Sequence, residues 1–181
     1  QGKEHETHTD VLVNKKGKPR EVMTLAHEGG QGGQQVVAAR NGALRAPTPL
    51  TLAGTAGVLG EMLTFRRLVA ATADPPERRA MLAAKVEDMI NTVVRQIAFY
   101  SFERKVHLAR REGELTSDAI SDIWMSVQAE SLGPAIKLMP GYETYWSYIP
   151  HFIHSPFYVY AYAFGDCLVN SLYGVFEKAQ D

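Results

Sequence analysis

The segment TLAHEGGQ carries the residues of this sequence that could do metal chemistry. The His27 imidazole can bind Zn²⁺, and the neighbouring Glu28 carboxylate can polarise a water molecule on the ion. Residues four apart share one face of a helix, so a second imidazole would belong at position 31, which is Gln31. An amide oxygen is a weak zinc ligand compared with an imidazole nitrogen. Taken alone, His27 and Glu28 are more often an ordinary helical pair, so their surroundings must decide.

A second group of chemically capable side chains lies in YWSYIPHFIHSPFYVYAYAFG. It contains the hydrogen-bonding residues His151, His154, Tyr158, Tyr160 and Tyr162. Their imidazoles and phenols can donate hydrogen bonds to a ligand. The alternative is that these aromatic side chains pack in a core or interface with their polar tips satisfied.

Five other titratable residues are expected to lie outside a functional site. His5 and His8 have a spacing that could bind a metal, but in a polar terminal segment we expect them to be solvated. Arg95, Glu103 and His107 lie in a long helical pattern, and we expect them to make structural contacts.

The pattern of apolar residues predicts helices that position both groups. We expect a short strand at residues 11–14, a turn at KKGKP, and helices at about 19–40, 51–73 and 76–112. A fourth helix opens at Thr116 with Ala119, or at Ser117 with Ile120, and runs to about residue 131. The last helix is expected to start at Ser155 and Pro156 and to end near residue 178. The predicted fold class is all-α with a short N-terminal strand remnant.

The first predicted helix contains an unusual cluster of glycines at positions 29, 30, 32 and 33. Each glycine inside a helix costs about 1 kcal/mol relative to alanine. Only tertiary packing could therefore keep this segment helical.

The composition fits one domain over residues 11–181, after a polar, disordered or extended lead-in at residues 1–10. The 19 Lys and Arg nearly balance the 20 Asp and Glu, so neither nucleic acid nor a membrane surface is favoured as a partner. Cys167 is the only cysteine, which excludes an intramolecular disulfide. No stretch approaches the roughly 20 apolar residues of a membrane span. We therefore expect a cytoplasmic protein.

Four segments carry a family resemblance. GKPREVMTLAHEGGQ resembles the zinc helix of the oligoendopeptidase F and thimet oligopeptidase family of zinc metallopeptidases, in which a second His follows the first by four residues. APTPLTLAGTAGVLGEMLTF resembles the family's next conserved helix, and residues 91–112 resemble its long helix. The aromatic segment resembles the stretch that brings a His and Tyr residues towards the substrate. The resemblance covers about residues 11–178, the C-terminal part of a zincin-like helical catalytic domain.

The resemblance implies a zinc cofactor, with His27 as a ligand and Glu28 as the general base. It also implies that Glu61 supports a ligand His from behind its ring, without contacting the metal. The family's two other ligand positions correspond to Gln31 and Gly54. Because a catalytic zinc site needs about three protein ligands, tight zinc binding is not expected.

For the aromatic segment, the resemblance implies catalytic roles for His151, Tyr158 and Tyr160 and substrate binding for His154 and Tyr162. In the family, an imidazole or phenol here donates a hydrogen bond to the oxyanion formed from a peptide carbonyl.

Three interpretations of function stay open. The first is a metallopeptidase that hydrolyses short peptides with metal-activated water, weakly active or inactive because its zinc site is degenerate. The second is a non-catalytic descendant that binds peptides or has a structural role. The third is a fragment that needs a missing N-terminal lobe or self-association.

Overall fold

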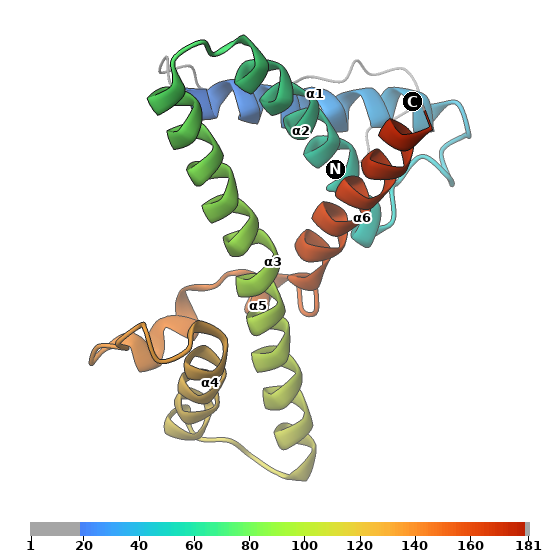
Figure 1. Cartoon of the computed structure of the whole chain (residues 1–181). Helices are drawn as coiled ribbons and strands as arrows, with labels where there is room; N and C mark the ends of the chain where they lie inside the picture. Colours follow the sequence, from blue (N-terminus) through green and yellow to red (C-terminus); the bar gives the residue numbers. More distant parts are fainter. Residues whose placement is uncertain (1–18, 180–181) are drawn as a thin grey trace. The chain divides into compact units, whose positions relative to one another are not determined.

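The computed structural model describes residues 19–179, and this part of the chain is helical and contains no strand (Figure 1). The strand expected at residues 11–14 and the lead-in at 1–10 lie outside the described residues. Internal contacts divide the chain into two compact units. The described part of the first comprises residues 19–88 and 164–179, and the second comprises residues 89–163. That residues 11–181 fold as one domain stays a prediction.

In chain order the elements are α1 (Pro19–Ala39), η1 (Leu50–Leu52), α2 (Thr55–Ala71), α3 (Pro75–Glu112), α4 (Ser117–Leu132), η2 (Tyr142–Tyr148), α5 (His151–His154) and α6 (Tyr160–Lys178). The all-α fold class predicted from the sequence is confirmed for the described residues.

Local signals explain where several helices begin and end. Pro19 and Pro75 stand at the first residues of α1 and α3, where a missing backbone N–H costs nothing. The Thr116 side chain accepts a hydrogen bond of 3.2 Å from the Ala119 N–H, as the first of the two expected start signals predicts. Gly133, with φ of 69°, ends α4. The predicted helices near 19–40, 76–112 and 117–131 are therefore confirmed within a residue or two.

Two predicted helix starts were wrong. The helix expected from Thr51 begins only at Thr55, because the chain first forms the 3₁₀ turn η1. The helix expected from Ser155 begins at Tyr160, after the separate short helix α5. Phe157 has φ of 60°, a left-handed conformation that cannot continue a right-handed helix. The apolar sequence pattern showed no break at either of these two places, so it did not predict the later helix starts.

In the first unit, α1 and α2 pack through glycines. A methyl group added to Gly30 would overlap the backbone carbonyl of Ala56, and one added to Gly60 would overlap that of Ala26. The two backbones therefore lie closer than any side chain at these positions would allow. This close packing explains why α1 stays helical through its glycine cluster, as expected from the sequence.

The second unit has an aromatic core that joins α3, α4 and the segment after α4. Phe99 and Phe102 of α3 pack on Trp124 of α4, with ring centroids 5.6 and 5.2 Å apart. Trp124 is 1% exposed, and its indole N–H donates a 2.9 Å hydrogen bond to the Tyr142 carbonyl. This bond attaches η2 to the core, and η2 leads directly to α5 and the aromatic segment.

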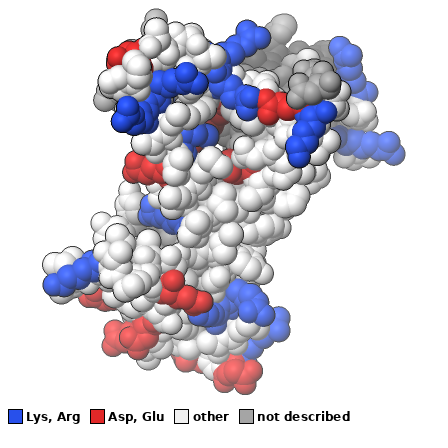
Figure 2. Space-filling view, in the orientation of Figure 1, with Lys and Arg blue, Asp and Glu red and all other residues white. Residues whose placement is uncertain are grey.

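The described surface carries both signs of charge. On the face drawn in Figure 2, basic and acidic side chains are interspersed with uncharged surface. No helix among residues 19–179 has the length and apolar character required to cross a membrane.

Candidate functional site

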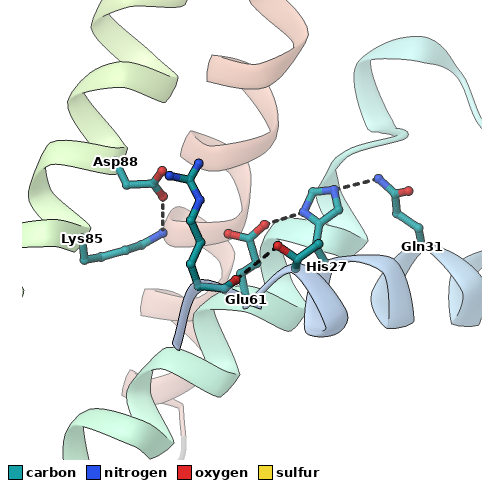
Figure 3. A network of polar contacts seen from close by, with 7 residues as sticks. His27, Gln31, Glu61, Lys85 and Asp88 are labelled. Atoms are coloured by element: carbon teal, nitrogen blue, oxygen red, sulfur yellow. Dashed lines mark hydrogen bonds and ion pairs between the residues drawn. The ribbon is translucent and has the colours of Figure 1, made fainter. Parts of the chain in front are cut away.

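His27 of α1 and Glu61 of α2 meet where the two helices pack. The His27 Nδ1 and Glu61 Oε1 atoms are 2.5 Å apart, and both side chains are about three-quarters buried (Figure 3). The ring fits because position 57 has no side chain: a Cβ on Gly57 would lie 2.6 Å from His27 Nε2. The structure thus places Glu61 behind the imidazole, on the side away from a ligand at Nε2.

Gln31 reaches the other nitrogen of the same ring. Its Nε2 atom lies 2.8 Å from His27 Nε2, one helical turn along α1, so Glu61 and Gln31 approach opposite sides of the imidazole (Figure 3). An amide N–H can only donate, so His27 Nε2 accepts and the ring proton is on Nδ1, where it is donated to Glu61. Both ring nitrogens are satisfied without an additional ligand.

The hydrogen bond that His27 donates to Glu61 is the main cause of a shifted pKa at His27. It raises the pKa of His27 above its ordinary value, and the charges of Glu61 and Glu28 act in the same direction, whereas burial opposes them. Glu28 is half-buried on α1 and adjoins His27 in the chain. The residues predicted to act as ligand and general base are thus neighbours on one helix.

The residues present do not fit a zinc ion. Within residues 19–179, no group of three or more His, Cys, Asp or Glu side chains could hold a metal. The His27 Nε2 atom that would face the ion is engaged by Gln31, and Gly54 at the start of α2 offers no donor. Zinc in proteins is held by three or four nitrogen, sulfur or carboxylate donors, and one imidazole does not meet that need.

Charged residues of α3 and α6 adjoin this group in the first unit. Lys85 and Asp88 form an ion pair of 3.2 Å on α3. Asp166 of α6 is 4% exposed, and burial raises its pKa; Asp88 and Glu61 add to the rise, while Lys85 opposes it. No sequence signal indicated a role for Asp166, because a single Asp in an apolar helix matches no motif.

The second unit brings three of the predicted aromatic-segment residues together. Tyr162 Oη lies 3.1 Å from His151 Nε2, within hydrogen-bond distance. The Tyr158 ring stacks on His151 with centroids 5.4 Å apart and planes 13° from parallel, and it meets Tyr162 edge-on at 5.1 Å. Burial, with help from Tyr158, raises the pKa of Tyr162 to about 12, so its phenol stays protonated and can donate. We call these three residues the His-Tyr cluster.

The two other predicted residues of this segment lie differently. The Tyr160 ring packs edge-on against Tyr100 of α3, with centroids 5.8 Å apart. His154 is exposed at the end of the short helix α5. The structure therefore offers no contact that joins Tyr160 or His154 to the His-Tyr cluster.

Glu103, expected to be structural, contacts the segment that carries the cluster. Its Oε1 atom accepts a 2.6 Å hydrogen bond from the Phe157 N–H, although the residue is only 3% exposed. Burial raises the pKa of Glu103, and the Phe157 N–H and the His107 and His151 rings lower it. No sequence motif indicated this contact over 54 residues.

Comparison with known proteins agrees with this helical fold. The profile of Peptidase family M3 matches residues 3–179. The chromosomal oligoendopeptidase F of Lactococcus lactis subsp. cremoris is 31% identical over 166 residues, which cover 91% of this chain and 27% of the relative. An oligoendopeptidase F homolog of Borreliella burgdorferi is 28% identical, with coverage of 94% and 30%.

A solved structure is similar as well. The crystal structure of oligoendopeptidase-F from Enterococcus faecium matches with a TM-score of 0.68 at 28% identity, and the match covers 84% of this chain and 28% of that one. The chain belongs to Peptidase family M3. It spans less than a third of the length of the curated relatives described above.

Proposed function

We propose that this chain is an oligoendopeptidase F-like metallopeptidase whose zinc site is degenerate, so that hydrolysis of short peptides is weak or absent. The observation that carries the proposal is the 2.8 Å contact between Gln31 Nε2 and His27 Nε2, at the atom that would bind the metal. Family membership favours peptide chemistry, and the donor set argues against a tightly held ion. Glu28 would act as general base only where a metal is retained.

The proposal is tested by restoring the missing donors. The Gln31→His and Gly54→Glu double variant supplies an imidazole and a carboxylate, and a Cβ at Gly54 meets no atom within 4 Å, so the first side-chain carbon causes no clash there. We expect sub-stoichiometric zinc by elemental analysis and negligible cleavage of a quenched peptide library by the original chain. The restored variant should bind zinc at least tenfold more tightly, a change of about 1.4 kcal/mol or more.

Two matched controls isolate the donors. Gln31→Leu with Gly54→Gln changes the same positions without adding an imidazole or a carboxylate, and it should bind no more zinc than the original chain. Glu28→Gln in the restored variant should keep zinc while reducing any cleavage, because the general base is lost. Tight, stoichiometric zinc in the original chain would contradict the degenerate site.

A second candidate function is peptide binding without catalysis, and the His-Tyr cluster favours it. Its phenol and imidazole groups are hydrogen-bond donors, and Tyr162 remains 36% exposed. We propose that short peptides bind here through their backbone carbonyls. Fluorescence anisotropy with labelled peptides tests this: Tyr162→Phe should weaken binding, whereas Tyr148→Phe, at a 79% exposed tyrosine of η2, should not. Absence of peptide binding by the original chain would remove this candidate.

A further inference from the structure

The turn between α5 and α6 holds an uncommon backbone conformation. Phe157, with φ of 60°, is the single non-glycine residue with positive φ in the described chain. A bulky side chain rarely adopts this conformation, and where it does the surrounding structure has to hold it. The contacts around Phe157 must therefore account for the turn.

Two residues of α3, one helical turn apart, make those contacts. The buried Glu103 carboxylate accepts a 2.6 Å hydrogen bond from the Phe157 N–H. The His107 ring packs on the Phe157 ring with centroids 4.6 Å apart. One residue thus holds the backbone of Phe157 and the other its side chain.

The backbone turn at Phe157 also sets the direction of the next residue, Tyr158. Tyr158 directly follows Phe157 and stacks on His151, which also lies within hydrogen-bond distance of Tyr162. If Phe157 relaxed to negative φ, the chain would leave the turn in another direction, and Tyr158 could not keep this stacking. The geometry of the His-Tyr cluster therefore depends on a backbone angle that Glu103 holds.

The burial of Glu103 suggests a role beyond packing. Its Oε2 atom is buried and has no hydrogen-bond partner among the described residues. A buried carboxylate with one unsatisfied oxygen is costly, and an apolar side chain would fill the same space more cheaply. Its bond to the Phe157 N–H is the contact that an apolar residue could not provide.

We infer that Glu103 is a positioning residue for the His-Tyr cluster: its carboxylate holds Phe157 in the left-handed conformation and so keeps Tyr158 stacked on His151. The inference rests on the proposed peptide binding only for its functional consequence. The structural part of the inference concerns only the conformation of the turn. The turn conformation and peptide binding can be measured separately.

The first experiment uses NMR on the unmodified chain and two variants. In the unmodified chain, the Phe157 amide should be protected from hydrogen exchange, and nuclear Overhauser contacts should join the Tyr158 and His151 rings. Glu103→Gln keeps an acceptor oxygen and should keep both signals. Glu103→Leu removes the acceptor and should lose both, with peptide affinity reduced roughly tenfold.

A rescue variant separates positioning from general stability. Glycine reaches positive φ without steric cost, so Phe157→Gly added to Glu103→Leu should restore the Tyr158–His151 contacts at least in part. A merely structural Glu103 would give no such rescue. If the Phe157 amide of the unmodified chain exchanges without protection, the inference is overturned, whether or not Glu103→Leu folds. It is also overturned if Glu103→Leu folds and keeps the contacts between the Tyr158 and His151 rings. Ring contacts that respond as expected without any peptide binding would instead refute the binding proposal alone.

Discussion

The amide of Gln31 donates to His27 Nε2 over 2.8 Å, while Glu61 engages His27 Nδ1 on the other side of the ring. Glu61, expected from the sequence to support a ligand histidine, does lie against an imidazole. That imidazole is satisfied by protein atoms alone, so in this chain the group can serve as a polar link between α1 and α2.

Replacing Gln31 should therefore affect stability as well as metal binding. Gln31→Leu leaves Nε2 of the largely buried His27 ring without its partner, and we expect a loss of about 0.5–1.5 kcal/mol in the free energy of unfolding. Urea unfolding measures it. Gln35→Leu, at an exposed position of the same helix, is the control and should change stability little. Equal stabilities of the two variants would show that the contact contributes nothing.

Substituting glycines of α1 by alanine should change stability in opposite directions at different positions. A Cβ at Gly29 or Gly33 meets no atom within 4 Å, so each alanine substitution should stabilise the helix by about 1 kcal/mol. Gly30→Ala should destabilise by more than that, because its methyl group overlaps the Ala56 carbonyl. Thermal unfolding of the three variants checks the order. A stabilising Gly30→Ala would mean that α1 and α2 are not so closely packed.

Gly57→Ala should displace the His27 ring. Its methyl group would lie 2.6 Å from the ring, so the imidazole must move and its contacts with Glu61 or Gln31 must break, at about 1–3 kcal/mol. With His27→Ala already present, the same change should cost much less. A double-mutant cycle measures this coupling, and equal costs in both backgrounds would rule out the steric explanation.

The buried Glu103 should make stability depend on pH. Its folded pKa is raised by burial, although the Phe157 N–H, His107 and His151 oppose the rise. A raised folded pKa means that the unfolded carboxyl loses its proton first as the pH rises. The stabilising contribution is therefore full below the unfolded pKa and is lost as the pH rises through the folded pKa.

The Glu103→Gln variant isolates this effect. The stability of the unmodified chain minus that of the variant should fall from acid pH up through the folded pKa and then level off. Urea unfolding from pH 4 to pH 8 gives both curves. Because every other titratable group is the same in both proteins, the contributions of those groups largely cancel. Parallel curves would contradict a raised pKa at Glu103.

Tyr162 should keep its proton well into the alkaline range. Burial raises its pKa to about 12, so the difference in phenolate absorbance between the unmodified chain and Tyr162→Phe should appear only near that pH. Spectrophotometric titration at about 295 nm measures it. A difference that develops near pH 10, the ordinary value for tyrosine, would show that the phenol is not shielded.

Much of the fold follows from local sequence. Pro19, Pro75 and Thr116 set helix starts through effects within a few residues, so pattern and capping rules find them. The motif around His27 also indicated the family, and the family resemblance implied that Glu61 would support an imidazole. The contact between His27 and Glu61 depends on how α1 and α2 pack against each other, and rules based on local sequence do not predict that packing.

The sequence by itself therefore determined the helical class, the family and the presence of Gln31 and Gly54 beside His27 and Glu61, because each depends on residue identity or short-range periodicity. Tertiary structure alone decided that the Gln31 amide contacts the His27 ring and that α1 stays helical through its glycine cluster. It also decided that the last helix begins only at Tyr160, because Glu103, 54 residues earlier in the chain, holds Phe157 in a left-handed turn. Such contacts depend on which segments fold together, and residues distant in sequence carry no local signal of that meeting.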